Sequence, residues 1–276
     1  MNYIEFDFSV KTPAPASDIL IAELADIGFE SFVETENGFL AYVSEKDFSE
    51  EKTADLIASK KYFFDFSFQQ KNIPDKNWNE EWEHNYHPVI VSENCVIRAP
   101  FHAPKNMKYE IIIEPKMAFG TGHHDTTLLM MRALLKLSLD KKNILDMGCG
   151  SGVLSIMASK RGAATVFAVD IDEWSYKNTL ENTVINNTKN VDVCKGDAQI
   201  LADKKFDIIL ANINRNVLLD DMKIYFSALE KNGDLLMSGF LKQDAETLKT
   251  KAFETGFIFQ EEVSENNWLF LHFSKK

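Results

Sequence analysis

The residues most able to do chemistry begin with an acid and three glycines, spaced Asp146-x-Gly148-x-Gly150-x-Gly152. This segment follows the apolar run NILDM and precedes an amphipathic stretch, so it predicts a strand, a tight turn and a helix. Glycines permit such a turn and let a ligand approach the main chain closely. We therefore expect Gly148 and Gly150 to bind a ligand and Asp146 to hold a ligand ammonium group.

The loop excludes two common nucleotide sites. A nicotinamide-binding loop has the pattern G-x-G-x-x-G, which requires glycine where this chain has Val153. A Walker phosphate loop requires Gly-Lys-Ser or Gly-Lys-Thr, and neither follows these glycines. An acid placed before the glycines suits a nucleoside that carries an amino acid rather than a phosphate. The loop therefore indicates S-adenosylmethionine as the cofactor.

Further acids follow where such a ligand would meet the sheet. Asp170 ends the run TVFAVD, 22 positions after Gly148, and a carboxylate there accepts hydrogen bonds from ribose hydroxyls. Asp172 is interpreted as the N-cap of the next helix. Asp197, in CKGDAQ, resembles an ordinary turn residue when taken alone. In series with Asp146 and Asp170 it is expected to accept a hydrogen bond from the adenine amino group.

Two asparagines, Asn212 and Asn214, follow the apolar run FDIILA at the sheet edge where ligands bind. Enzymes that methylate planar nitrogens usually have N-P-P-Y here, and this chain lacks both prolines and the aromatic ring. The acceptor is therefore expected to be a tetrahedral amine. Asn212 is the candidate for orienting it, with Asn214 as the alternative. No general base is assigned, because desolvation alone lowers the pKa of a lysine amine.

Periodicity divides the 276 residues into two domains and a linker. Residues 1–70 show the order strand, helix, strand, strand, helix, strand, which predicts a small ferredoxin-like α+β sandwich. Residues 71–100 predict a linker with a short helix, whose aromatic stripe would pack on a domain or, alternatively, face the substrate. Residues 101–276 alternate strands with helices, which predicts a Rossmann-like α/β domain. One of these helices is expected over residues 217–233.

Charge is spread unevenly along the chain. The formal net charge is −12, and residues 1–70 hold 14 Asp and Glu against 5 Lys, a net of −9. This surplus opposes nucleic-acid binding by the first domain and favours a basic partner, although solubility alone would also explain it. No apolar run is long enough for a membrane helix and no secretion signal is recognised, so we expect a cytoplasmic protein.

Cysteine and histidine give no metal site. Cys95, Cys149 and Cys194 are far apart and form no C-x-x-C pair, so neither a disulfide framework nor a zinc site is indicated. His123 and His124 have no cysteine or carboxylate pair at ligand spacing. They are expected to belong to a loop that closes over the cofactor.

The segments MAFGTGHHDTT, LDMGCGSGVL, AVDID and LANI give the chain a specific resemblance. Over essentially its whole length, including the small domain and NWNEEW, it resembles the PrmA family of methyltransferases, which modify the eleventh protein of the large ribosomal subunit. The family usually has a proline before the paired threonines and P-G before the methionine. This chain has Asp125 and Pro115-Lys116 at those places.

The resemblance implies a class I methyltransferase domain with a seven-stranded mixed sheet. It further implies that Thr127, Gly148, Asp170 and Asn212 contact S-adenosylmethionine, and that the acidic first domain grips the basic ribosomal protein. The activity implied is multiple methylation of lysine side-chain and N-terminal amines, by an enzyme taken to be a monomer. A methyltransferase for a different protein or small-molecule amine, or an adaptor that has lost catalysis, remain the alternatives.

Overall fold

The computed structural model of the protein contains two compact units, Met1–Asn85 and Tyr86–Lys276. It describes residues 2–11, 13–73, 86–116, 120 and 122–276. The linker was expected to extend to residue 100, but the division falls after Asn85, because residues 86–100 contribute two strands to the larger unit. The short helix expected between Pro74 and Pro88, with Trp78, Trp82 and Tyr86 on one face, lies outside the described residues except for its last positions. None of the described helices combines the length and apolar character that a membrane crossing requires.

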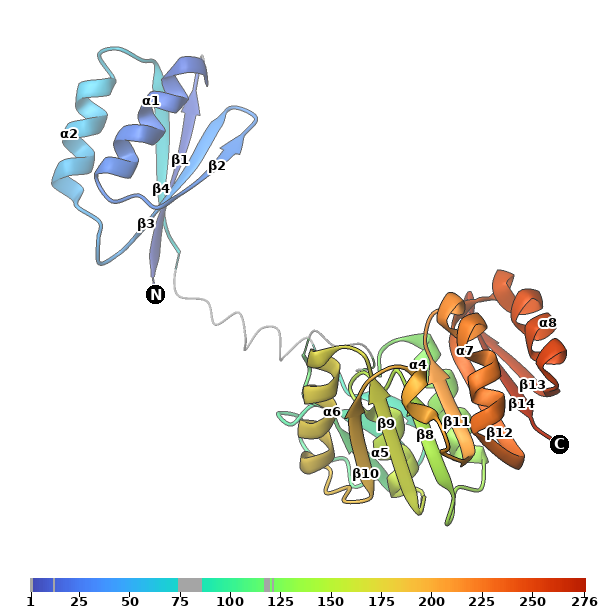
Figure 1. Ribbon diagram of the computed structural model, residues 1–276. Helices are drawn as coiled ribbons and strands as arrows, with labels where there is room; N and C mark the ends of the chain where they lie inside the picture. The colour runs from blue at the N-terminus through green and yellow to red at the C-terminus, as the bar shows by residue number, and fades with distance from the viewer. Residues whose placement is uncertain (1, 12, 74–85, 117–119, 121) are drawn as a thin grey trace. The chain divides into compact units, whose positions relative to one another are not determined.

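The small unit is a four-stranded antiparallel sheet with two helices (Figure 1). Its sheet order is β2-β3-β1-β4, and the chain order βαββαβ with this arrangement is the ferredoxin-like sandwich that the sequence predicts. Its elements are β1 (Tyr3–Val10), α1 (Pro13–Asp26), β2 (Ser31–Thr35), β3 (Gly38–Ser44), α2 (Glu50–Lys60) and β4 (Phe66–Ile73).

Alternation along strand β1 separates a buried face of the sheet from an exposed one. Its apolar residues Ile4, Phe6, Phe8 and Val10 are buried in the core of this unit, and the Phe8 ring stacks on Phe39 with centroids 4.9 Å apart. The period of two places the intervening residues, Glu5 and Asp7 among them, on the opposite face. The sheet therefore has one aromatic face under the helices and one face that carries carboxylates.

The larger unit contains two sheets and the helices that cover them. Its seven-stranded sheet has the order β10-β9-β8-β11-β12-β14-β13, in which β14 alone runs opposite to the other six strands. Strands β5, β6 and β7 form a second sheet. The mixed sheet confirms the predicted Rossmann-like α/β class. The elements are β5 (Val89–Ser92), β6 (Cys95–Arg98), β7 (Tyr109–Ile112), α4 (Asp125–Lys136), β8 (Asn143–Met147), α5 (Val153–Lys160), β9 (Thr165–Asp170), α6 (Glu173–Ile185), β10 (Val191–Lys195), η1 (Ala198–Leu201), β11 (Phe206–Asn212), α7 (Arg215–Ala228), β12 (Leu229–Leu241), η2 (Lys242–Asp244), α8 (Ala245–Thr255), β13 (Ile258–Glu265) and β14 (Trp268–Ser274).

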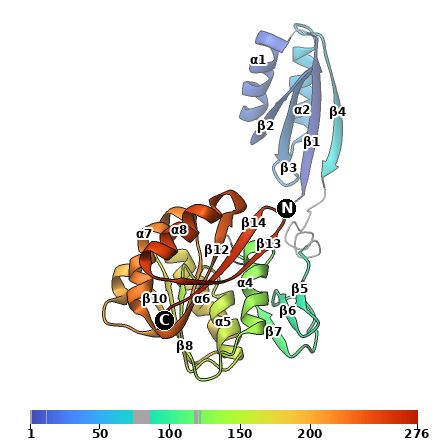
Figure 2. The same ribbon diagram turned by 90° about the vertical axis from the view of Figure 1, so that its right-hand side faces the viewer.

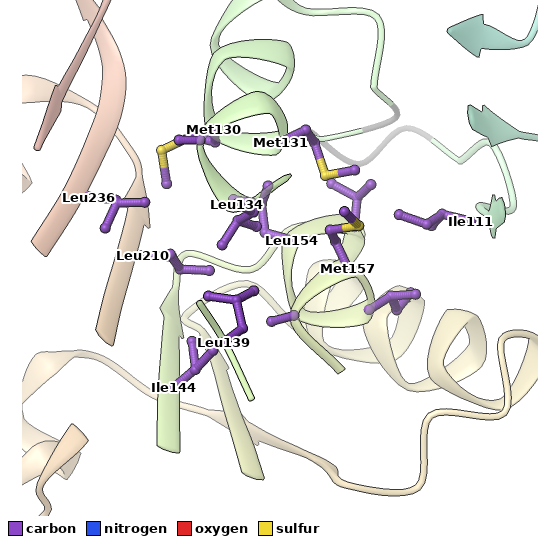
Figure 3. Close-up of a cluster of buried hydrophobic side chains, with 14 of the residues drawn as sticks. Ile111, Met130, Met131, Leu134, Leu139, Ile144, Leu154, Met157, Leu210 and Leu236 are labelled. Carbon is purple, nitrogen blue, oxygen red and sulfur yellow. The ribbon is translucent and has the colours of Figure 1, made fainter. Parts of the chain in front are cut away.

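Hydrophobic cores fill both faces of the seven-stranded sheet. Successive residues of a central strand enter different cores: Leu210 of β11 lies with Met130 and Leu134 of α4, whereas Ile209 lies with the core under α7 and α8. Figure 3 shows the first of these clusters, with Leu210 and Leu236 facing the side chains of α4. Figure 2 shows the helices on the two sides of the sheet. Burial on both faces explains why these strands are nearly continuous apolar runs.

One sequence-based boundary is wrong. The helix expected over residues 217–233 ends at Ala228, and strand β12 begins at Leu229. Asn232 adopts a left-handed backbone (φ 62°) and donates its N–H to the Lys275 carbonyl at 2.7 Å. Because this contact and the pairing of Leu229 with Phe206 draw residues 229–233 into the sheet, tertiary contacts override the helical spacing that these residues share with α7.

The central cluster yields a stability prediction. Leu210→Ala should lower the free energy of unfolding by about 2–5 kcal/mol, because the leucine is fully buried in a close-packed core. Leu180→Ala on α6 is the matched control, since this leucine is 37% exposed and should cost less than about 1 kcal/mol. Urea unfolding followed by circular dichroism measures both variants. Similar losses in the two would contradict the assigned core.

Candidate cofactor and acceptor site

A cavity of about 630 Å³ opens at the carboxyl ends of the parallel strands. Ligands of open α/β sheets bind at this edge, and the volume lies within the range of small-molecule sites, about 300–1,000 Å³. Figure 1 shows β9, β8 and β11, whose ends contribute to it, side by side. The residues that line it are His124, Met147, Gly148, Gly150, Asp170, Ile171, Ser175, Gly196, Asp197, Asn212, Ile213, Asn214, Val217, Asp220, Asp221, Gly239 and Trp268.

The glycine loop forms part of this cavity wall with its main chain. Gly148 has φ 72°, and a Cβ added there would lie 2.2 Å from Cγ2 of Ile213. Gly150 also has a left-handed backbone, and its N–H donates to Oδ2 of Asp170 at 2.9 Å. Both positions therefore require glycine, one for space and both for backbone angle. The loop leaves no room for a side chain at Gly148, and ligand binding by Gly148 and Gly150 stays a prediction.

Two of the predicted acids line the cavity beside this loop. Asp170 is buried, and its oxygens accept from the N–H groups of Gly150 and, at 3.0 Å, Asp172. Each carboxylate oxygen has a second lone pair, so Asp170 retains acceptor capacity for ribose hydroxyls. Asp197 accepts from Gln199 N–H at 2.9 Å. Asp172 caps α6 through Ser175 N–H at 2.8 Å, as expected.

Asn212 supplies the cavity with a buried acceptor. It is the last residue of β11, and its side-chain Oδ1 has no hydrogen-bond partner among the described residues. Buried polar atoms are normally paired, so an unpaired carbonyl on a residue that lines a cavity is a candidate to accept a ligand group. Asn214 also lines the cavity, but its Oδ1 accepts from Val217 N–H at 3.2 Å and caps α7. The geometry therefore favours Asn212 over Asn214 as the amine-orienting group.

Two predicted contacts, Asp146 and Thr127, lie outside the cavity wall. Asp146 is buried behind the glycine loop, where Oδ2 accepts from the Ser155 N–H at 3.0 Å and hydroxyl at 2.5 Å. Oδ2 therefore anchors the start of α5, whereas Oδ1 has no hydrogen-bond partner among the described residues, and Asp146 is not one of the residues that line the cavity. Thr127 is fully buried in α4, and its hydroxyl has no partner among the described residues. Neither residue lines the cavity, so the direct ligand contact expected of each stays a prediction.

The paired histidines separate in the structure. His124 lines the cavity, caps α4 through its Nδ1, and packs its ring on Trp268 with centroids 4.6 Å apart. His123 donates from Nε2 to the His87 carbonyl at 3.0 Å. In the part of the chain that the structure describes, no group of three His, Cys, Asp or Glu side chains is arranged to hold a metal ion.

Sequence reasoning missed several lining residues. Val217, Asp220 and Asp221 lie on one face of α7 at helical spacing, a signal that periodicity could have revealed once Asn212 was placed. Trp268 begins the last strand, which the sequence patterns did not predict.

The residues in this cavity fit a nucleoside that carries an amino acid. The main chain approaches closely at Gly148, Asp170 has free acceptor capacity, and Asn212 holds an unpaired carbonyl. No lysine or arginine is among the described lining residues, so phosphate groups would find no cationic side chain here.

Comparison with known proteins identifies the family. Residues 18–276 match the family model described as ribosomal protein L11 methyltransferase (PrmA). This chain belongs to the PrmA family. The protein named ribosomal protein L11 methyltransferase in Porphyromonas gingivalis is 44% identical, over 99% of this chain and 98% of that protein. The one in Chlorobaculum tepidum is 34% identical, over 97% and 95%.

Solved structures agree with this assignment. The ribosomal protein L11 methylase of Lactobacillus delbrueckii subsp. bulgaricus has a TM-score of 0.65 and 29% identity, covering 69% of this chain and all of that chain. A methyltransferase from Pyrococcus furiosus, 20% identical with a TM-score of 0.51, covers 60% of this chain and 89% of its own, and shows the fold alone. The predicted PrmA resemblance is confirmed.

Burial of Asp146 yields a pH prediction. Burial, the main cause, raises the pKa of this carboxyl from 3.8 to about 6. At a pH between 3.8 and about 6, Asp146 keeps its proton in the native state but has released it in the unfolded chain. The free energy of unfolding therefore falls as the pH rises through this range. Asp146→Asn removes this titration. From about pH 4 to about pH 7, the free energy of unfolding of the wild type should therefore fall by about 3 kcal/mol relative to that of the variant.

Urea unfolding of both proteins at the two pH values measures this difference. Asp192→Asn on β10, an exposed position outside the cavity, controls for the loss of one carboxylate. A constant difference between wild type and the Asp146 variant across the range would contradict the raised pKa.

Proposed function

We propose that the protein transfers methyl groups from S-adenosylmethionine to lysine side-chain and N-terminal amines of ribosomal protein L11, and that it does so in the cytoplasm, where ribosomal proteins are made. Membership of the PrmA family supports the methyltransferase activity and the substrate protein. The observation that carries the choice of amines is the unpaired Oδ1 of Asn212 in an anionic cavity without lysine or arginine among its described lining residues.

Cofactor binding would use the residues already placed at the cavity. Asp170 accepts from the ribose hydroxyls, Asp197 accepts from the adenine amino group, and Gly148 and Gly150 allow the ligand to approach the main chain. When bound, S-adenosylmethionine supplies a methyl group that its sulfonium has already activated. The protein therefore has mainly to align the acceptor and exclude water.

The acceptor must arrive with a free lone pair. A lysine ammonium, with an unperturbed pKa of about 10.4, has none, and desolvation lowers this pKa. We assign no general base. The Asn212 carbonyl accepts a hydrogen from the neutral amine, which turns the lone pair away from Asn212 and toward the methyl group. The lost proton passes to solvent.

The acidic small unit is proposed to hold the basic substrate protein. Its net charge of −9 over residues 1–70 attracts a cation-rich surface. Glu5 and Asp7 lie on the sheet face opposite the aromatic core. The strand residues facing Glu5 are Tyr42 and Lys71, whereas those facing Asp7 are Leu40 and Gln69, so Asp7 is the carboxylate of the two without a cation opposite it. This face therefore offers carboxylates to a partner.

The first experiment is transfer of labelled methyl from S-adenosylmethionine to purified, unmethylated large-subunit proteins, followed by mass mapping. Label should appear on lysines and the N-terminus of L11. Label on another protein, or none despite bound cofactor, would favour the alternative acceptors or the non-catalytic adaptor.

Asn212→Ala should reduce the methyl transfer rate about 10- to 100-fold, the equivalent of one hydrogen bond of about 1.5–3 kcal/mol to the reacting amine. The melting temperature should stay near that of the wild type, since Oδ1 has no partner to lose among the described residues. Asn216→Ala, an exposed position outside the cavity, is the matched control. Full activity of the Asn212 variant would refute the orienting role.

Glu5→Gln combined with Asp7→Asn should raise the KM for L11 by about 3- to 10-fold with little change in kcat, because only the encounter surface loses charge. The control removes two exposed carboxylates from α8, Glu246→Gln with Glu254→Gln. Steady-state kinetics at low salt measures both. An equal rise in KM in the control would mean that overall charge, and not this face, attracts the substrate.

A further inference from the structure

The cofactor cavity carries more negative charge than the proposed contacts require. Four carboxylates line it, from Asp170, Asp197, Asp220 and Asp221, and no lysine or arginine is among the described lining residues. The cation at the start of α7, Arg215, donates to Asp244 at 2.8 Å and to Asn216 at 3.1 and 3.2 Å. It is thus bound outside the cavity wall. No cationic side chain among the described lining residues neutralises these carboxylates, so a positively charged ligand would be favoured in the cavity.

Asp221 is the fixed member of the pair on α7. It is half-buried, and Oδ2 accepts from the Tyr225 hydroxyl at 3.1 Å, one helical turn further along. Tyr225 is completely buried, which holds the carboxylate in place. Asp220 is exposed, so solvent screens its charge more strongly.

Repulsion among the carboxylates affects the ionisation of Asp221. Burial raises the pKa of the Asp221 carboxyl, the charges of Asp197 and Asp220 raise it further, and the hydrogen bond from Tyr225 opposes the shift. The two charged neighbours that act on Asp221, namely Asp197 and the adjacent Asp220 on α7, therefore carry the same sign as Asp221. A cation bound beside Asp221 would relieve this repulsion.

Resting on the proposed function, we propose that Asp221, assisted by Asp220, makes the cavity select its cofactor by charge. It favours the sulfonium form over the neutral thioether product. When the amine lone pair bonds to the methyl carbon, the electron pair of the carbon–sulfur bond passes to sulfur. The positive charge then belongs to the methylated amine. The product nucleoside has lost the charge that the carboxylates hold, and this favours its exchange for a fresh, charged cofactor.

A simpler role for Asp221 is a hydrogen bond to the adenine amino group. The adenosine part is common to cofactor and product, so this role predicts an equal loss of affinity for both when the carboxylate is replaced. Charge selection predicts a loss for the cation alone. The two roles therefore give different affinity patterns.

The test is calorimetric titration of the full chain with S-adenosylmethionine, S-adenosylhomocysteine and sinefungin, in which a charged amine replaces the methylated sulfonium. In Asp221→Asn the Kd for the two cations should rise by about 5-fold, and this rise should shrink at high salt. The Kd for S-adenosylhomocysteine should change less than about 2-fold. Asp192→Asn, outside the cavity, should change none of the three.

Equal losses for all three ligands, or no loss for any, would overturn charge selection. The proposed function is tested separately by the wild-type chain, because failure of that chain to bind any of the ligands would refute the cofactor assignment before a variant is made.

Discussion

The left-handed turn through Gly148, Gly150 and Gly152 is the constraint on which the site depends. All three residues have φ between 57° and 79°, which turns the chain back at the end of β8 and directs the Gly150 N–H to Asp170 on β9. The register of these strands sets Met147 beside Val169, so the loop and the acid meet at one edge. A side chain at Gly148 would collide with Ile213, so the cavity wall here can only be main chain.

Buried polar contacts hold this loop from behind. Asp146 ties it to the first turn of α5 through Ser155, and α6 reaches it twice, with the Thr179 hydroxyl on the Gly150 carbonyl and the Asn182 amide on the Ser151 carbonyl, both at 2.8 Å. Each of these groups would be costly to leave unpaired in the interior. The polar side chains of α6, a helix with little apolar asymmetry, therefore act to fix the loop rather than to fill a core.

The sequence predicted the parts of this site that depend on short-range patterns, and it did not predict the contacts between residues far apart in the chain. The strand, glycine turn and helix at 143–160, and Asp170 at the end of the next strand, depend on short-range patterns that the chain displays directly. The hydrogen bonds of Asp146 to Ser155 could not be predicted, because spacing alone does not show which side chain the carboxylate contacts. Trp268 could not be foreseen, since it reaches His124 only through the pairing of β14 with β12.

The small unit and the cofactor cavity of the larger unit both concentrate negative charge, but the two clusters act over different distances. Fields from the small unit are screened beyond about 8 Å at physiological salt, so they can attract a basic protein without choosing one of its amines. The cavity carboxylates act on whatever enters, and there the half-buried Asp221 is less screened than a surface acid. Choice of the reacting amine therefore requires a contact of hydrogen-bond length, which we propose that Asn212 makes through its unpaired Oδ1.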